Sequence, residues 1–151
     1  MDRLSSPPGW EELVYNKRIA LGVDADYGGV SADPTVFSVT AQVMPDKEPA
    51  EVERAVDSLL NQVRSEPVSE RELEKAKNQI EAGFIFGQDS IFGQAMRIGQ
   101  YESAAQWRFL DAYLAGIRKV TAADILKAAK RHLDPDRPTA GILVPIKEKK
   151  Q

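Results

Sequence analysis

A change in hydrophobic periodicity, from two residues to about 3.6, limits most strongly the folds open to this 151-residue chain. Apolar and polar residues alternate over 21–27 and again over 37–43, a pattern typical of strands with one side in water. A loop rich in Gly, Ser, Asp and Pro separates the two stretches and predicts an antiparallel hairpin. From residue 52 onward, apolar residues recur at i, i+3, i+4 and i+7, which predicts amphipathic helices. We therefore expect an α+β fold, an antiparallel sheet with helices packed on one face.

The expected element order is α-β-β-α-α-α-α-α-β, beginning with a short helix over 10–18. Asp46 is predicted to cap the first long helix, and two capping boxes, Ser69 with Glu72 and Thr121 with Asp124, should begin later ones. The last strand is expected over 139–146. We expect a single domain over 1–151, with flexible ends at 1–8 and 147–151. Three strands are few for so many helices, so we expect the chain to be part of a larger domain.

The composition excludes several kinds of chemistry, because the chain has one histidine, His132, and no cysteine. Disulfides and cysteine nucleophiles are ruled out, and a self-contained catalytic zinc site is unfavourable because it needs about three ligands drawn mainly from His and Cys. The net charge of -3 argues against a nucleic-acid partner. No apolar run approaches the roughly 18 residues needed to span a membrane. The first eight residues lack the apolar stretch of a secretory signal, which leaves cytoplasm and periplasm both open.

Two groups of polar residues are candidate sites. His132 lies near Asp134 and Asp136 in sequence and could join them around a metal. The turn chemistry of the Asp-Pro-Asp segment explains both carboxylates without a metal, and His132 suits the C-terminal end of a helix. Asp24 and Asp26 lie about 7 Å apart on one side of a strand, and this spacing could suggest paired catalytic carboxylates. Because they alternate with apolar residues, a solvated strand face is the favoured interpretation.

A repeated Gly-Gln motif occurs three times at six-residue intervals, at 86–88, 92–94 and 98–100. Six residues advance a helix by about 240° beyond a full turn, so the three copies do not share a face. No strand leads into the motif and no Lys-Ser/Thr follows it, which argues against a phosphate-binding loop. We expect a loosely packed helix with close backbone contacts.

Five ordered segments covering most of the chain resemble one protein family. They are 13–20 followed by the alternating strand, 48–52, 68–77 with its Ser-x-x-Glu-Leu-x-x-Ala-Lys pattern, 115–125 with Ile-x-x-Val-Thr-x-x-Asp-Ile, and 139–145. Together they are similar to the insulinase/pitrilysin family of zinc metallopeptidases (inverzincins) and their processing-peptidase relatives. Each pattern is weak alone, and the resemblance rests on their order.

The resemblance implies an α+β domain that works beside a homologous one. One domain of the pair carries zinc on a His-x-x-Glu-His motif with a distal Glu. This chain lacks that motif and resembles the later part of the non-zinc, C-terminal domain, without its first helix and strands. No cofactor is expected in this chain, and zinc is implied in the homologous partner domain. The implied partners are that zinc-bearing domain, in the same chain or another subunit, and a peptide substrate. An exposed sheet edge should also favour self-association.

In active members the non-zinc half can lend an Arg and a Tyr to the active site, the Tyr helping to hold the oxyanion. Those positions fall at Val14 and Leu21, which cannot donate a hydrogen bond, so no catalytic residue is carried over. Tyr15 and Arg18 are close but wrongly spaced.

Three hypotheses follow. The first is a non-zinc segment of a zinc metalloendopeptidase that supplies chamber wall and substrate binding. The second is an inactive structural or assembly subunit of the same ancestry. The third is an unrelated α+β interaction domain. We expect the isolated chain to bind no stoichiometric zinc and to cleave no peptide.

Overall fold

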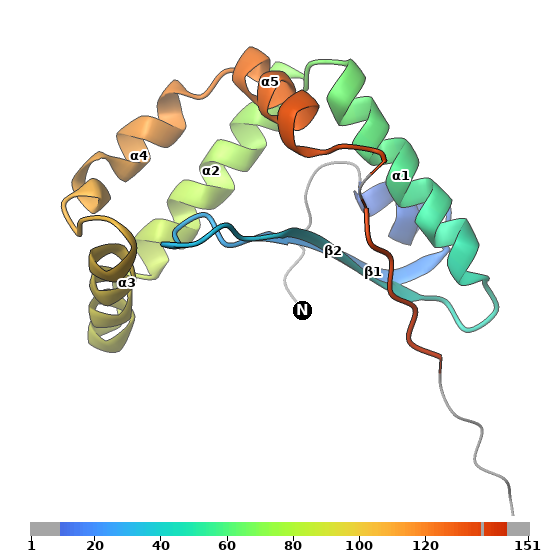
Figure 1. The fold of residues 1–151 in the computed structure, drawn as a ribbon, viewed down its shortest axis with the longest axis horizontal. Coiled ribbons are helices and arrows are strands. Elements are labelled where there is room, and N and C mark those ends of the chain that lie inside the picture. The colour runs from blue at the N-terminus through green and yellow to red at the C-terminus, as the bar shows by residue number, and fades with distance from the viewer. Residues whose placement is uncertain (1–9, 137, 145–151) are drawn as a thin grey trace, which may run out of the picture.

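The computed structural model describes residues 10–136 and 138–144 and has the predicted α+β class. The helices lie on one side of a two-stranded hairpin and form an open arch over it (Figure 1). The elements, in order, are the short π-helix η1 (Glu12–Asn16), β1 (Ala20–Tyr27), β2 (Phe37–Val43), α1 (Pro49–Ser65), α2 (Glu70–Phe86), α3 (Ile91–Ala104), α4 (Phe109–Lys119) and α5 (Ala122–His132). From η1 to α5, the elements follow one another in the predicted order.

The hairpin is antiparallel, as predicted, and its paired residues extend to Tyr27 opposite Phe37. A bulge between Ala20 and Gly22 interrupts the register near the start of β1. Such a bulge adds a residue to one strand and reverses the side on which the following side chains lie. Ala20 is therefore only 1% exposed, whereas Leu21 is 50% exposed. The alternation of apolar and polar residues predicted that Leu21 lies on the buried side of the strand, and this prediction was wrong.

The core lies where η1, the start of β1 and α1 meet. Leu13 of η1 has no exposed surface. The buried cluster consists of Trp10, Leu13, Ile19, Ala20, Val23 and Val52, with partly buried residues of β2 and α1 packed around it. The apolar side of the hairpin is thus covered by α1 at one end only, and Tyr27 and Phe37 at the other end are exposed.

The helix starts confirm two of the three predicted caps. Ser69 and Thr121 each form a reciprocal capping box, with Glu72 and Asp124 respectively. The prediction for Asp46 was wrong, because α1 begins at Pro49 and makes no side-chain cap bond. Proline supplies a fixed φ and lacks an N–H, so it starts a helix without a side-chain cap.

The final strand predicted over 139–146 is not formed in its described part, residues 139–144. Residues 139–144 pair with neither strand of the two-stranded sheet, and they therefore lack the backbone partner that a strand needs. The segment is exposed instead, with Leu143 97% exposed. Residues 145 and 146, and the ends predicted to be flexible, lie outside the described residues.

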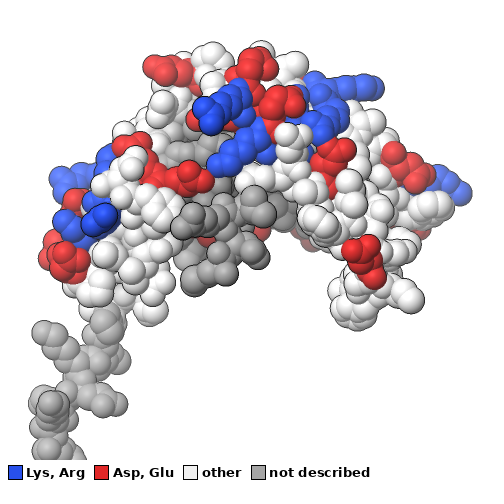
Figure 2. Space-filling view, turned by 180° about the vertical axis from the view of Figure 1, so that it is seen from behind, with Lys and Arg blue, Asp and Glu red and all other residues white. Residues whose placement is uncertain are grey.

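The surface divides into a charged and a largely uncharged part. Figure 2 shows Lys and Arg interspersed with Asp and Glu along most of the helical arch. The lobe at the lower right of that view, where α3 lies, is mostly white. In the part of the chain that the structure describes, no helix has the length and hydropathy that a membrane crossing requires.

Candidate functional site

The two positions at which the resemblance would place catalytic groups lie at the start of the fold. Val14, in η1, packs against the buried cluster. Leu21 lies at the bulge of β1 and is half exposed. Tyr15 is 59% exposed, and Arg18 has a φ of 51°, in the left-handed region, where η1 gives way to β1. Neither Val14 nor Leu21 can donate to an oxyanion, so these positions supply no transition-state contact.

The residues around His132 form a helix end and a turn. His132 is the last residue of α5, whose final turn also contains Lys130 and Arg131, as suits the negative end of the helix dipole. Beyond it, the amide N–H of Asp136 donates to Asp134 Oδ1 at 3.0 Å, the local bond of an Asx-turn. Within residues 10–136 and 138–144, no three His, Cys, Asp or Glu side chains cluster closely enough to hold a metal ion.

Asp24 and Asp26 project from the polar side of β1. They lie opposite Thr40 and Ser38 of β2, and all four residues are solvent-exposed or nearly so. Nothing in this arrangement buries one carboxylate or separates the two environments, as acid–base catalysis by a carboxylate pair would require.

Of the three glycines in the Gly-Gln motif, two lie too close to neighbouring atoms to accommodate a side chain easily, and the third does not. At the α2–α3 corner, a Cβ on Gly87 would collide with the guanidinium of Arg97, and a Cβ on Gly93 would lie 3.1 Å from the Gly87 carbonyl oxygen. Close backbone contact was predicted and is found at these two. At Gly99 a Cβ would meet nothing within 4 Å.

Because Gly87 has no side chain, the guanidinium of Arg97 can lie beside a group of aromatic rings. The Arg97 guanidinium lies 4.6 Å from the Phe84 ring centroid, and its Nη1 donates to the Phe84 carbonyl oxygen at 3.2 Å. Phe84 stacks on Tyr113 of α4 at 5.3 Å, and Tyr113 meets Tyr101 of α3 edge to face at 6.4 Å. Burial, and secondly the neighbouring Tyr113, raise the pKa of Tyr101 above its usual value. The four side chains thus join the ends of α2, α3 and α4.

Beside these rings, the β1–β2 loop and the α3–α4 corner line a cavity of about 230 Å³ that is widely open to solvent. Its walls are Gly29, Val30 and Ser31 from the loop, Tyr101, Ala104 and Ala105 from the end of α3, and Phe109 from the start of α4. Gln100 Nε2 donates to the Val30 carbonyl oxygen at 3.3 Å and ties the loop to α3. Sequence reasoning placed the loop but missed the cavity, because its two walls lie about seventy residues apart in the chain.

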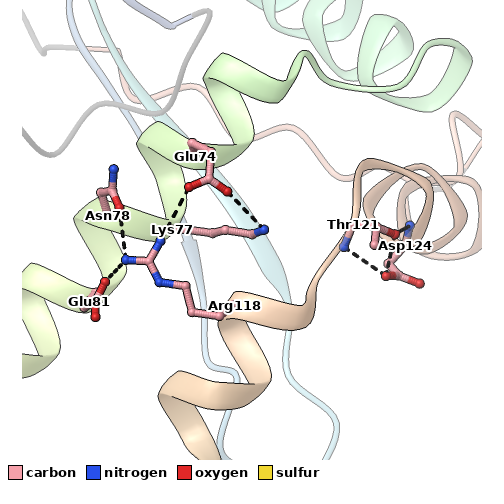
Figure 3. A network of polar contacts seen from close by, with 7 residues as sticks. All are labelled: Glu74, Lys77, Asn78, Glu81, Arg118, Thr121 and Asp124. Carbon is pink, nitrogen blue, oxygen red and sulfur yellow. Dashed lines mark hydrogen bonds and ion pairs between the residues drawn. The ribbon is translucent and has the colours of Figure 1, made fainter.

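A second polar network joins α2 to α4 (Figure 3). Arg118 forms ion pairs with Glu74, at 3.5 Å, and with Glu81, and it donates to Asn78 Oδ1 at 3.1 Å. Lys77, whose side chain is mostly buried, pairs with the other oxygen of Glu74 at 3.3 Å. Because Arg118 and Glu74 are substantially exposed, this network fixes the angle between two helices and contributes little to the free energy of unfolding.

Comparison with known proteins identifies the fold. Neither a protein-family model nor a curated protein sequence matches this chain. Several solved structures do match, and three of them are described here. The inactive peptidase domain of a Bordetella parapertussis protein described as a zinc protease is 18% identical, with a TM-score of 0.83 over 98% of this chain and 80% of that one. A protein described in the same way from Bordetella pertussis Tohama I is 19% identical, with a TM-score of 0.78 over 95% of this chain and 80% of that one.

The third structure is a protease from Helicobacter pylori, 22% identical, with a TM-score of 0.75 over 82% of this chain. This chain spans only 30% of that protease. The chain has a zinc-protease-like fold. At these identities the likeness describes the architecture, and the chemistry has to be argued from the residues present.

Proposed function

We propose that this chain is the non-zinc, C-terminal segment of a zinc-dependent metalloendopeptidase of the insulinase/pitrilysin type, and that it supplies chamber wall and substrate binding. The observation that carries the proposal is the likeness to an inactive peptidase domain, which extends over 98% of the chain. The ordered sequence resemblance, found independently of the structure, supports the same family.

The residues present support a binding role over a hydrolytic one. Zinc-dependent hydrolysis needs about three protein ligands and a metal-activated water. The whole sequence has one histidine, no cysteine and no His-x-x-Glu-His motif, so the zinc centre of this proposal lies on another polypeptide segment. What this chain offers a substrate is a cavity with largely apolar walls and a hairpin whose strand edges can accept a further strand.

Reconstitution tests the proposal. The chain is mixed with the His-x-x-Glu-His polypeptide encoded in the same reading frame or by a neighbouring gene, and cleavage of an unfolded protein is measured. We expect cleavage by the mixture alone, with one zinc per complex by elemental analysis. A matched control replaces the Glu of that motif by Gln, which should abolish cleavage without dissociating the complex. One zinc held tightly by the isolated chain, or full activity of the partner without it, would contradict the proposal.

A second candidate is an inactive assembly subunit of the same ancestry. The observation that favours it is the outward side of α3, where Phe92 is 75% and Met96 60% exposed, together with the open hairpin edges. Exposed apolar surface and unpaired strand edges both promote association. Sedimentation from micromolar to millimolar concentration should then show self-association of the chain, and a monomer throughout this range would count against it.

A further inference from the structure

The cavity between the β1–β2 loop and the α3–α4 corner belongs to none of the groups that the sequence singled out. Its volume of about 230 Å³ is below the roughly 300–1,000 Å³ of sites for drug-sized ligands. A space of that size suits a single large side chain better than a whole cofactor or nucleotide.

The walls select the kind of side chain. Val30, Ala104 and Ala105 present aliphatic surface, and Tyr101 and Phe109 present rings, against which a flat ring can stack or meet edge to face. The hydroxyls of Ser31 and Tyr101 are the polar side-chain groups of the lining, and neither carries a charge while Tyr101 keeps its proton. Burial favours that neutral form, because it raises the pKa of Tyr101. A charged side chain would lose part of its hydration here, and no side chain of the lining carries an opposite charge.

The walls are also held in place before any ligand arrives. Tyr101 is fixed by its contact with Tyr113, which in turn stacks on Phe84. On the loop side, Gln100 bonds to the Val30 carbonyl oxygen, and Thr35 Oγ1 donates to the Gly28 carbonyl oxygen at 3.0 Å. Preformed walls lower the entropy lost on binding.

The position of the cavity at the end of the hairpin indicates an extended ligand. β1 ends at Tyr27, two residues before Gly29 in the cavity wall, and the Tyr27 ring would lie 3.8 Å from a Cβ on Gly29. A polypeptide that adds to a strand edge runs parallel to the strands, so its next residues reach the loop and the cavity.

We propose that this cavity binds one large apolar side chain, aromatic by preference, of an extended polypeptide. The inference rests on the proposed function only in taking a peptide as the ligand. It assigns to this chain a side-chain specificity that is independent of any zinc centre.

The test uses the isolated chain and two blocked tripeptides, acetyl-Gly-Phe-Gly-amide and acetyl-Gly-Ala-Gly-amide, followed by two-dimensional ¹⁵N NMR. We expect the Phe peptide to bind about tenfold more tightly than the Ala peptide, the lower end of what burying such a side chain provides. Its amide shifts should concentrate at residues 29–31 and 104–105. Equal affinity of the two peptides, or shifts dispersed elsewhere, would overturn the inference.

Two variants make the test specific. Ala104→Phe fills the cavity from the end of α3 and should weaken binding of the Phe peptide about tenfold, cancelling its advantage. Ala95→Phe places the same ring on an exposed position of the same helix and should bind like the parent chain. Thermal melting verifies that both are folded. An Ala104→Phe chain that is folded and binds as well as the parent also overturns the inference.

The outcome is separable from that of the proposed function. Selective peptide binding by a chain that never supports cleavage with a zinc-bearing partner contradicts the proposed function alone. An active complex whose isolated non-zinc chain shows no preference between the tripeptides contradicts this inference alone.

Discussion

Two regions of the molecule are held together in different ways. We name residues 10–65, with η1, the hairpin and α1, the hairpin layer, and residues 70–119, with α2, α3 and α4, the helical arm. All six residues of the buried cluster belong to the hairpin layer. In the helical arm, Leu73 and Lys77 are the buried residues, and both are on α2.

The helical arm relies on directional contacts instead. Arg97 and its aromatic neighbours hold α3, the Arg118 ion pairs hold α4, and a capping box begins α2. In water, each such contact contributes about 1 kcal/mol or less, whereas a buried Leu contributes several. Most of the free energy of unfolding therefore resides in the hairpin layer. The proposed binding cavity lies at the border between the two regions, where the Tyr101–Tyr113 contact and the Gln100–Val30 bond hold its walls.

The largest expected effect comes from the centre of the hairpin layer. Leu13→Ala should lower the free energy of unfolding by about 2–5 kcal/mol, because Leu13 has no exposed surface and its loss leaves a cavity. Urea unfolding followed by circular dichroism measures this change. The variant should be unfolded to a substantial extent even at low urea, since small domains have only about 5–15 kcal/mol in total.

The matched control for that prediction is Leu21→Ala in the adjoining strand. Leu21 is half exposed because of the bulge, so its truncation should change the free energy of unfolding by no more than about 0.5 kcal/mol. Equal effects of the two truncations would mean that the buried cluster is not centred on η1, and the contrast between the two regions would lose its basis.

The next effect, about 1 kcal/mol, is expected at the start of the helical arm. Ser69→Ala removes the side-chain acceptor of the capping box and should cost that amount, typical for the loss of such a cap. Hydrogen exchange should locate the loss in the first turn of α2, with amides of β1 unchanged. Equal acceleration in β1 would show that the two regions open as one unit, contrary to the comparison.

What the sequence predicted well was local. The two capping boxes need only a Ser or Thr and an acidic residue three positions on, and both formed. The alternation predicted the hairpin, but it could not predict the bulge at Leu21, because an inserted residue is specified by packing against η1 and α1. Asp46 failed as a cap since Pro49 fixes the helix start three residues later.

The candidate site could not be predicted, because it depends on contacts between distant segments. No local sequence pattern predicts that Gln100 bonds to Val30 or that Arg118 pairs with Glu74. The repeated Gly-Gln motif was the nearest signal. It indicated close backbone contacts, which occur at Gly87 and Gly93, but it gave no sign of the guanidinium that occupies the space over Gly87.

A smaller effect is expected from the exposed ion pairs of the helical arm. Arg118→Met keeps most of the stem but removes the pairs with Glu74 and Glu81, and should cost about 0.2–1 kcal/mol at low salt. The cost should shrink between 0.05 and 0.5 M NaCl, because salt screens surface charges. The control is Arg131→Met, an exposed residue of α5, which should show a smaller cost. A cost of several kcal/mol that salt does not alter would give the helical arm a core of its own.

The smallest effect is the pH dependence of the α2 cap. Bonds from the Ser69 side chain and backbone lower the pKa of Glu72 below its ordinary 4.5. The unfolded state therefore takes up a proton first as pH falls, so the stabilisation is complete above the ordinary pKa and is lost as pH drops through the folded one. Urea unfolding between pH 6 and pH 3 should show the advantage of the parent chain over Ser69→Ala diminishing with acid. Ser103→Ala is the control, since its hydroxyl donates to the Gln100 carbonyl oxygen and to no carboxylate, and its cost should not vary with pH. If the cost of Ser69→Ala were equally constant, the cap would be an uncharged contact, and acid would not distinguish the helical arm from the hairpin layer.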